Sequence, residues 1–214
     1  MNRYPIPAKE ARAEIIVINS RFIASAGPAF SVEQARNFIA RIKSEFPDAS
    51  HHVPVYLIGF GASSTAHCSD AGEPAGTAGR PALAVLQGAG LGDVVVVVTR
   101  YFGGTRLGTG GLVRAYSDAV REVLDILPRA ERVPTHTVMI ALAYSFFERL
   151  RLMISEHHGV ILDQDFGAEV TISARFPVEH FQEFQADLGE LTRGAVEAEI
   201  IETNLDTILP FENL

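Results

Sequence analysis

Residues 94–120 read VVVVVTRYFGGTRLGTGGLVRAYSDAV, and this stretch decides the fold of the first half of the chain. The valine run predicts a strand because β-branched side chains favour extended backbone, and its lack of polar alternation predicts burial on both faces. A glycine-rich turn with two arginines follows. An apolar stripe then predicts an amphipathic helix that Pro128 ends; its members are Leu112, Tyr116, Ala119 or Val120, Val123 and Leu127.

A strand, a glycine loop and a helix in this order form the phosphate site of many proteins. Two nucleotide-binding motifs have this order. Gly103 and Gly108 satisfy the spacing G-x-x-x-x-G, but Thr109 and Gly110 stand where a P-loop needs a lysine and a hydroxyl residue. The dinucleotide fingerprint G-x-G-x-x-G also fails, because Gly108-Thr109-Gly110 has no third glycine in place. The sequence therefore argues against P-loop nucleotide hydrolysis.

The same loop keeps a second interpretation, an anion site. Backbone N–H groups at a helix N-terminus, flanked by arginines, suit an anion such as an RNA phosphate. The alternative is structural: glycines permit positive φ in a tight crossover, and the arginines are solvated. The residues predicted for anion or RNA contact are Arg100, Gly103, Gly104, Arg106, Gly108, Gly110, Gly111 and Arg114.

A polar segment, GASSTAHCSDAGEPAGTAGRP at 61–81, is predicted to be irregular because it is rich in Gly, Ser and Pro. His67, Asp70 and Glu73 are its candidate catalytic residues, with Cys68 beside them. A Cys–His nucleophile requires the two side chains to meet in space with a third group orienting the base, which adjacency in sequence does not provide. The alternative is that Asp70 and Glu73 only cap or turn the chain.

The amino-acid composition limits the classes of metal, cofactor and partner that the protein is expected to bind. One cysteine with scattered histidines is not a zinc pattern, so no metal and no cofactor are predicted. The single cysteine also excludes an internal disulfide and favours a reducing cytoplasm. No apolar run approaches the roughly 18 residues of a membrane span, and the first residues do not resemble a signal peptide. A membrane partner is therefore not expected.

Charge is unevenly distributed along the 214 residues, whose net charge is -8. Residues 1–127 carry 12 Lys+Arg against 11 Asp+Glu, whereas residues 128–214 carry 6 against 15. Because polyanion affinity comes mostly from neutralised phosphates, any contact with nucleic acid is expected in the first half, without DNA sequence specificity.

The second half predicts a separate small domain. Its strands and helices follow in the order βαββαβ, the ferredoxin-like pattern. Ser145 with Glu148 predicts a capping box at its first helix. The fold class is therefore α+β, with a first domain at 1–127, a linker at 128–133 and a ferredoxin-like domain at 134–214.

Three stretches carry a family resemblance: SRFIA at 20–24, SDAGEPAGTAGRP at 69–81 and the opening stretch at 94–120. They closely resemble the YigZ/IMPACT family over most of residues 15–125. The acidic second half resembles the C-terminal domain of the bacterial branch. Two places depart from the usual family pattern: Ser69 and Ala71 around Asp70, and Val53-Pro54 after His52.

The family resemblance implies a fold and a general function. The first half is expected to resemble domain 2 of ribosomal protein S5 and the fourth domain of elongation factor G, and the second half that factor's fifth domain. Eukaryotic members restrain the amino-acid-starvation kinase by competing for its activator protein, through an organisation that includes a further N-terminal domain.

Three functions remain open at this point. The first is a cytosolic protein related to translation control that contacts RNA or the ribosome through the loop at 100–114. The second is an enzyme acting on a small phosphorylated or acyl substrate in a cleft near 67–73 and 100–114. The third is a regulator that binds only a protein partner.

Overall fold

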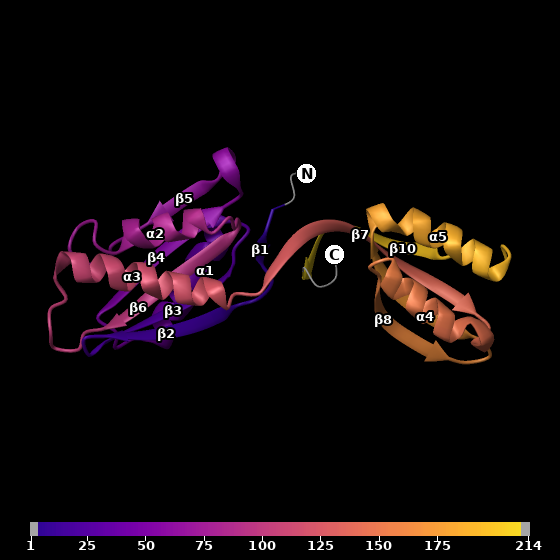
Figure 1. Cartoon of the computed structure of the whole chain (residues 1–214), viewed down its shortest axis with the longest axis horizontal. Helices are drawn as coiled ribbons and strands as arrows, with labels where there is room; N and C mark the ends of the chain where they lie inside the picture. Colours follow the sequence, from indigo (N-terminus) through magenta and orange to yellow (C-terminus); the bar gives the residue numbers. More distant parts are fainter. Residues whose placement is uncertain (1–3, 211–214) are drawn as a thin grey trace. The chain divides into compact units, whose positions relative to one another are not determined.

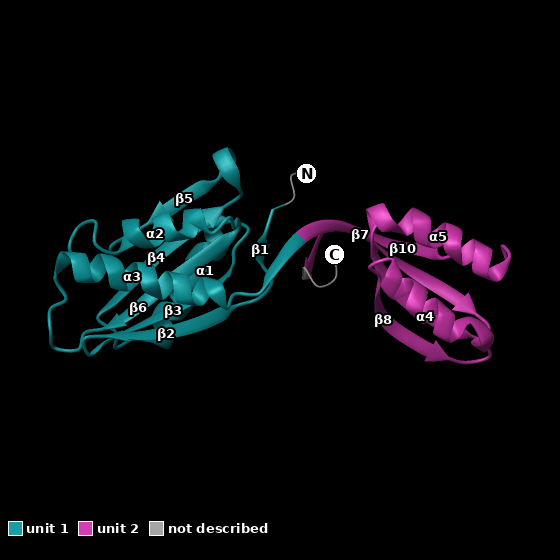
Figure 2. Cartoon of the chain, viewed as in Figure 1, with its two compact units in different colours: residues 1–131 teal, residues 132–214 magenta. Residues whose placement is uncertain are grey.

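The computed structural model describes residues 4–210, and the chain divides into two compact units, Met1–Glu131 and Arg132–Leu214 (Figure 2). Each unit builds its own hydrophobic core around one antiparallel sheet with helices.

The first unit is built on a sheet with strand order β2-β3-β6-β4-β5 (Figure 1). All neighbouring pairs are antiparallel. The strands are β2 (Ala11–Val17), β3 (Ser20–Pro28), β4 (His51–Ile58), β5 (Thr65–Cys68) and β6 (Val94–Tyr101). The valine run is therefore the central strand, which contacts β3 on one side and β4 on the other.

Helices cover both faces of this sheet. Val94, Val96 and Val98 belong to the core beneath α2 (Gly79–Gly88) and α3 (Gly108–Asp125). Val95 and Val97 point the other way and belong to the core beneath α1 (Val32–Glu45). All five valines are fully buried, so the prediction of a strand buried on both faces is confirmed.

Local sequence signals fix the ends of these elements. Ser31 is the N-cap of α1, and its Oγ accepts a hydrogen bond from the backbone N–H of Gln34 at 3.1 Å. The two-residue turn between β2 and β3 places Ile18 and Asn19 at φ 45° and 64°. Asparagine tolerates this left-handed region, whereas a β-branched isoleucine is strained in it.

The sequence missed two strands of the first unit. The segment at 61–81 was predicted to be irregular, yet Thr65–Cys68 form β5 on the edge of the sheet. This prediction was wrong because a short edge strand is held by its partner β4, not by its own composition. The second missed strand is β1 (Ile6–Pro7), which pairs with Arg129 and Ala130.

The second unit has the predicted βαββαβ order (Figure 1). Its elements are β7 (Arg129–Leu142), α4 (Phe147–Glu156), β8 (Val160–Phe166), β9 (Val170–Pro177), α5 (Val178–Thr192) and β10 (Glu199–Pro210). The strand order is β10-β7-β9-β8, which confirms the ferredoxin-like arrangement. The predicted capping box at Ser145 does not form, because residues 144–146 make a 3-10 turn and α4 begins after Phe146 without a side-chain cap.

The residues predicted as a linker, 128–133, lie mostly in a strand. β7 begins at Arg129, and the unit boundary falls within it, between Glu131 and Arg132. Sequence composition did not reveal this, because the extended backbone at Arg129 and Ala130 is held by hydrogen bonds to the distant β1.

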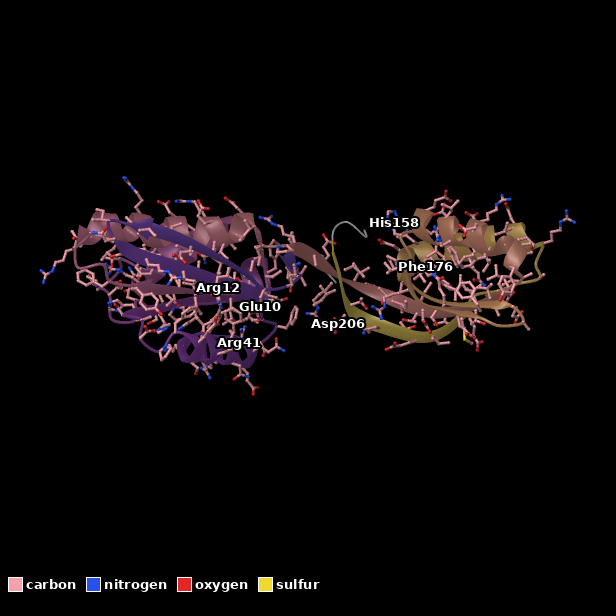
Figure 3. All side chains as sticks on the ribbon, turned by 90° about the horizontal axis from the view of Figure 1, so that it is seen from below. Glu10, Arg12, Arg41, His158, Phe176 and Asp206 are labelled. Atoms are coloured by element: carbon pink, nitrogen blue, oxygen red, sulfur yellow. The ribbon has the colours of Figure 1, made fainter. Side chains whose placement is uncertain are left out.

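Phenylalanine rings form the centre of the second core. The rings of Phe176 and Phe184 lie 4.2 Å apart by their centroids, and Phe176 is fully buried (Figure 3). Gly159 follows His157 and His158 after the end of α4 and lies against this core. A Cβ atom at Gly159 would approach Phe176 Cε1 to 2.4 Å and the Ile154 carbonyl oxygen to 2.8 Å.

We expect Gly159→Ala to destabilise the second unit by several kcal/mol, because both neighbours are fixed in the core. Gly189→Ala is the matched control. Gly189 lies inside α5 with open space at its Cβ position, so alanine should raise the free energy of unfolding by about 0.5–1 kcal/mol. Hydrogen exchange of peptides from β9 in the full chain would measure both effects. Equal exchange rates in the two variants would contradict the prediction.

Candidate functional site

A buried ion pair joins the polar segment to the valine strand. Glu73 Oε1 lies 2.6 Å from Arg100 Nη1 and accepts a hydrogen bond from the Tyr116 hydroxyl at 2.7 Å. The side chains of Glu73 and Arg100 are only 3% and 6% exposed. His51 Nε2 lies 3.9 Å from Glu73 Oε2. These four residues are called the Glu73 cluster below.

The Arg100 guanidinium lies among aromatic and polar side chains. Its Cζ lies 5.3 Å from the ring centroid of Phe22 and 5.5 Å from that of Phe102, which are cation–π distances. Arg100 Nη2 donates a hydrogen bond to Ser20 Oγ at 3.4 Å. Ser20 Oγ also accepts a hydrogen bond from the backbone N–H of Gly103 at 3.2 Å. The arginine is therefore an internal connector between β3, β6 and the loop after β6.

Tyr116 acts only as a hydrogen-bond donor in this cluster. Burial, followed by the hydrogen bond to the Glu73 carboxylate, raises the pKa of its hydroxyl far above the usual range. A phenol held protonated in this way cannot serve as a base at any physiological pH. Its hydroxyl contributes instead a fixed link between Glu73 and helix α3.

Asp70 organises the polar segment itself. Its carboxylate accepts hydrogen bonds from the backbone N–H groups of Gly76, Ala78 and Gly79 at 2.8, 3.1 and 2.8 Å. Partial desolvation alone would raise the pKa of this carboxyl, but the three donors and the nearby Arg80 hold it below its usual value. Asp70 thus caps the start of α2, as the structural interpretation of this residue predicts.

The remaining catalytic candidate, His67, lies on the other face of the sheet. His67 pairs with Tyr56 across β4 and β5, and the two rings stack with centroids 5.0 Å apart. Tyr56 belongs to the core beneath α1, whereas the partner of Cys68, Val55, belongs to the core beneath α2 and α3. Neighbours along a strand point to opposite faces, so His67 and Cys68 cannot form a nucleophile–base pair.

The structure therefore brings together only part of the predicted enzyme cleft. Glu73 and Arg100 meet, but as a buried ion pair without access for a substrate. Asp70 is engaged with backbone groups, and His67 is separated by the sheet. Among the described residues, no group of three or more His, Cys, Asp or Glu side chains is placed to hold a metal ion.

The predicted anion-binding residues divide into two groups. Arg100 and Gly103 are structural: Arg100 is buried, and a Cβ at Gly103 would lie 2.1 Å from the backbone of Asn19. The Arg100 guanidinium is paired with Glu73 inside the protein, and the Gly103 N–H is donated to Ser20 Oγ. Gly111 is also restricted, with a Cβ approaching that of Leu107 to 3.1 Å. The exposed group is Gly104, Arg106, Gly108, Gly110 and Arg114.

Sequence reasoning missed two members of this internal network. Tyr116 was assigned to the apolar stripe of α3, although a fully buried hydroxyl needs a hydrogen-bond partner. Ser20 gave no signal, because its contact with Arg100 joins residues that are 80 positions apart.

Comparison with known proteins gives the family. Residues 18–124 match the Impact N-terminal domain, and residues 140–195 match a domain of unknown function, DUF1949. The chain is 35% identical over 203 residues to the Escherichia coli protein called IMPACT family member YigZ, covering 94% of this chain and 100% of that one.

The chain belongs to the IMPACT family. A Haemophilus influenzae member is 34% identical, covering 94% of this chain and 98% of that protein. A Thermus thermophilus member is 46% identical over 115 residues, covering 54% of this chain and 60% of that protein. A crystal structure of a hypothetical protein matches with a TM-score of 0.61 at 35% identity, covering 94% of this chain and 98% of that one.

No helix within residues 4–210 is both long enough and apolar enough to span a bilayer.

We expect Glu73→Gln to lower the free energy of unfolding of the first unit by about 3–5 kcal/mol, because it leaves the buried Arg100 charge uncompensated. The control is Glu122→Gln on the exposed side of α3, which should change stability by less than about 0.5 kcal/mol. Urea unfolding of the full chain, with hydrogen exchange at residues 94–124 to assign the transition, measures both. A loss equal to that of the control would show that the pair does not stabilise the fold.

The lowered pKa of Asp70 predicts a pH dependence. A carboxylate whose pKa is depressed in the folded state adds stability above its unfolded pKa, and this stability is lost as pH falls through the folded value. Asp70→Asn should therefore be less stable than the natural chain near neutral pH, and the difference should shrink below about pH 4. Urea unfolding of both chains across this pH range measures the difference in stability. A difference that stays constant in acid would contradict a role for the charge.

Proposed function

We propose that this chain is a binding protein related to translation control that contacts RNA phosphates through the loop after β6 and the first turns of α3. The observation that carries the proposal is the start of α3. This helix begins at Gly108 after Leu107, whose side chain makes no capping hydrogen bond, and Gly108, Thr109 and Gly110 in its first turn are exposed. Uncapped N–H groups at a helix N-terminus favour an anion.

Two arginines flank this helix start. Arg106 precedes α3 and Arg114 lies in its second turn, and both are exposed. In contrast, Arg12, Arg21 and Arg41 each lie beside a carboxylate, of Glu45, Glu14 and Glu10. Figure 3 labels Arg41 and Glu10, which lie next to each other. Among the described residues, neither Arg106 nor Arg114 forms an ion pair. Their charge is therefore available to neutralise phosphates, which is the main source of RNA affinity.

The glycines of this region support a close approach of a ligand backbone. A Cβ atom at Gly104, Gly108 or Gly110 would meet nothing within 4 Å. Gly104 and Gly108 have φ of 84° and 73°, so their backbone conformation also favours glycine. The link to translation rests on the family resemblance, whereas the RNA contact rests on these exposed groups.

The enzyme alternative receives no comparable support. Its candidate acid and base residues are engaged in the buried Glu73 cluster, in the backbone contacts of Asp70 and on the far face of the sheet. A binding role requires none of these groups to reach a substrate, so it agrees with their burial.

The test is the salt dependence of binding to a fluorescein-labelled single-stranded RNA. Arg106→Ala/Arg114→Ala should weaken binding and reduce the slope of log K against log salt by about 1.4, at about 0.7 per lost phosphate contact. Arg36→Ala/Lys43→Ala removes the same charge from the exposed side of α1 and should leave the slope closer to that of the natural chain. Equal slopes in the two double variants, or no RNA binding by the natural chain, would reject the proposal.

A further inference from the structure

A groove with a volume of about 820 Å³ lies between α2 and α3, apart from the residues proposed to contact RNA. This volume is within the range of about 300–1,000 Å³ that ligand-binding clefts occupy. The groove exists because small residues line it from α2 and its C-cap, among them Ala84, Gly88 and Ala89. No atom lies within 4 Å of a Cβ placed on Gly88.

The floor of the groove is aliphatic. Pro81 and Val85 on α2 and Leu124 on α3 line it, together with Val113, whose side chain is 38% exposed. A β-branched apolar residue left exposed inside a concave surface gains stability when a partner covers it, in proportion to the area removed from water.

The rim carries an excess of positive charge. Arg80, Arg121 and Arg129 line the groove, with Asp125 as the carboxylate that lines it beside them. Arg121 also contacts Asp118, at 2.6 Å between Nη1 and Oδ1. The three guanidinium groups are exposed, so they complement a partner that brings carboxylates to the same edge.

The residues that line the groove include no aromatic ring or histidine. Single-stranded RNA binds mostly by stacking its bases on such rings, and an aliphatic floor offers no stacking platform. An amphipathic helix, in contrast, buries aliphatic side chains in a groove and leaves polar side chains at its rim.

We propose that the groove between α2 and α3 docks an amphipathic helix of a partner protein, with aliphatic residues facing Val85 and Val113 and carboxylates facing Arg80 and Arg129. Carboxylates of the partner helix form exposed ion pairs at the rim, which set its orientation more than its affinity. Burial of Val113 and its neighbours supplies most of the affinity. This inference does not rest on the proposed RNA contact, because the two surfaces use different side chains.

The experiment selects ligands from a phage-displayed library of random peptides on the immobilised full chain. Peptides rich in both aliphatic and acidic residues should be enriched, and one of them, synthesised with a fluorescein label, is measured by anisotropy. Val113→Glu should weaken its binding about tenfold or more by placing a charge in the apolar floor. Ala84→Glu on the opposite wall repeats this test from α2.

Two further variants test which arginines contribute to peptide binding. Arg80→Ala should weaken peptide binding several-fold and reduce its salt dependence, because one rim charge is lost. Arg106→Ala/Arg114→Ala should leave peptide binding unchanged, which separates this groove from the RNA surface.

Three outcomes would overturn the inference. One is that no peptide, or only basic peptides, are enriched. Another is that the selected peptide binds Val113→Glu and Ala84→Glu as tightly as the natural chain. The third is that Val113→Glu abolishes binding of the labelled RNA while no acidic peptide binds, which would assign the groove to nucleic acid.

Discussion

The buried ion pair between Glu73 and Arg100 is the interaction on which the first unit depends. Arg100 lies near the end of the central valine strand, and Glu73 belongs to a loop rich in glycine and alanine that has few large apolar side chains of its own. A buried charge is tolerated only when it is paired and hydrogen-bonded, so each of these residues requires the other. Tyr116 then adds helix α3 to the pair.

This arrangement explains two family stretches in structural terms. SDAGEPAGTAGRP supplies Asp70, which holds three backbone N–H groups, and Glu73, which reaches Arg100 and Tyr116 in the stretch at 94–120. The resemblance that identified the family therefore rests partly on a network that holds a loop, a strand and a helix together.

Because Arg100 is internal, the exposed residues that are proposed to bind a partner lie along α3. The start of this helix, where the N-cap Leu107 makes no side-chain hydrogen bond, lies between Arg106 and Arg114. One of its sides, with Val113, Ser117 and Arg121, forms a wall of the groove shared with α2. Both proposed surfaces are therefore positioned by the same helix, whose buried side, including Tyr116 and Val120, is fixed on the sheet.

By itself the sequence determined the α+β class, the buried valine strand, the βαββαβ order and the family, because these follow from short-range periodicity and long motifs. Only the tertiary structure decided which polar residues meet. Arg100 reads as an exposed phosphate ligand along the chain, and it becomes internal because Glu73, 27 residues away, and Phe22 on β3 enclose it. The start of β7, at Arg129 and Ala130, likewise depends on the distant strand β1. Side-chain burial and strand pairing are set by contacts between segments far apart in the sequence, which local patterns do not record.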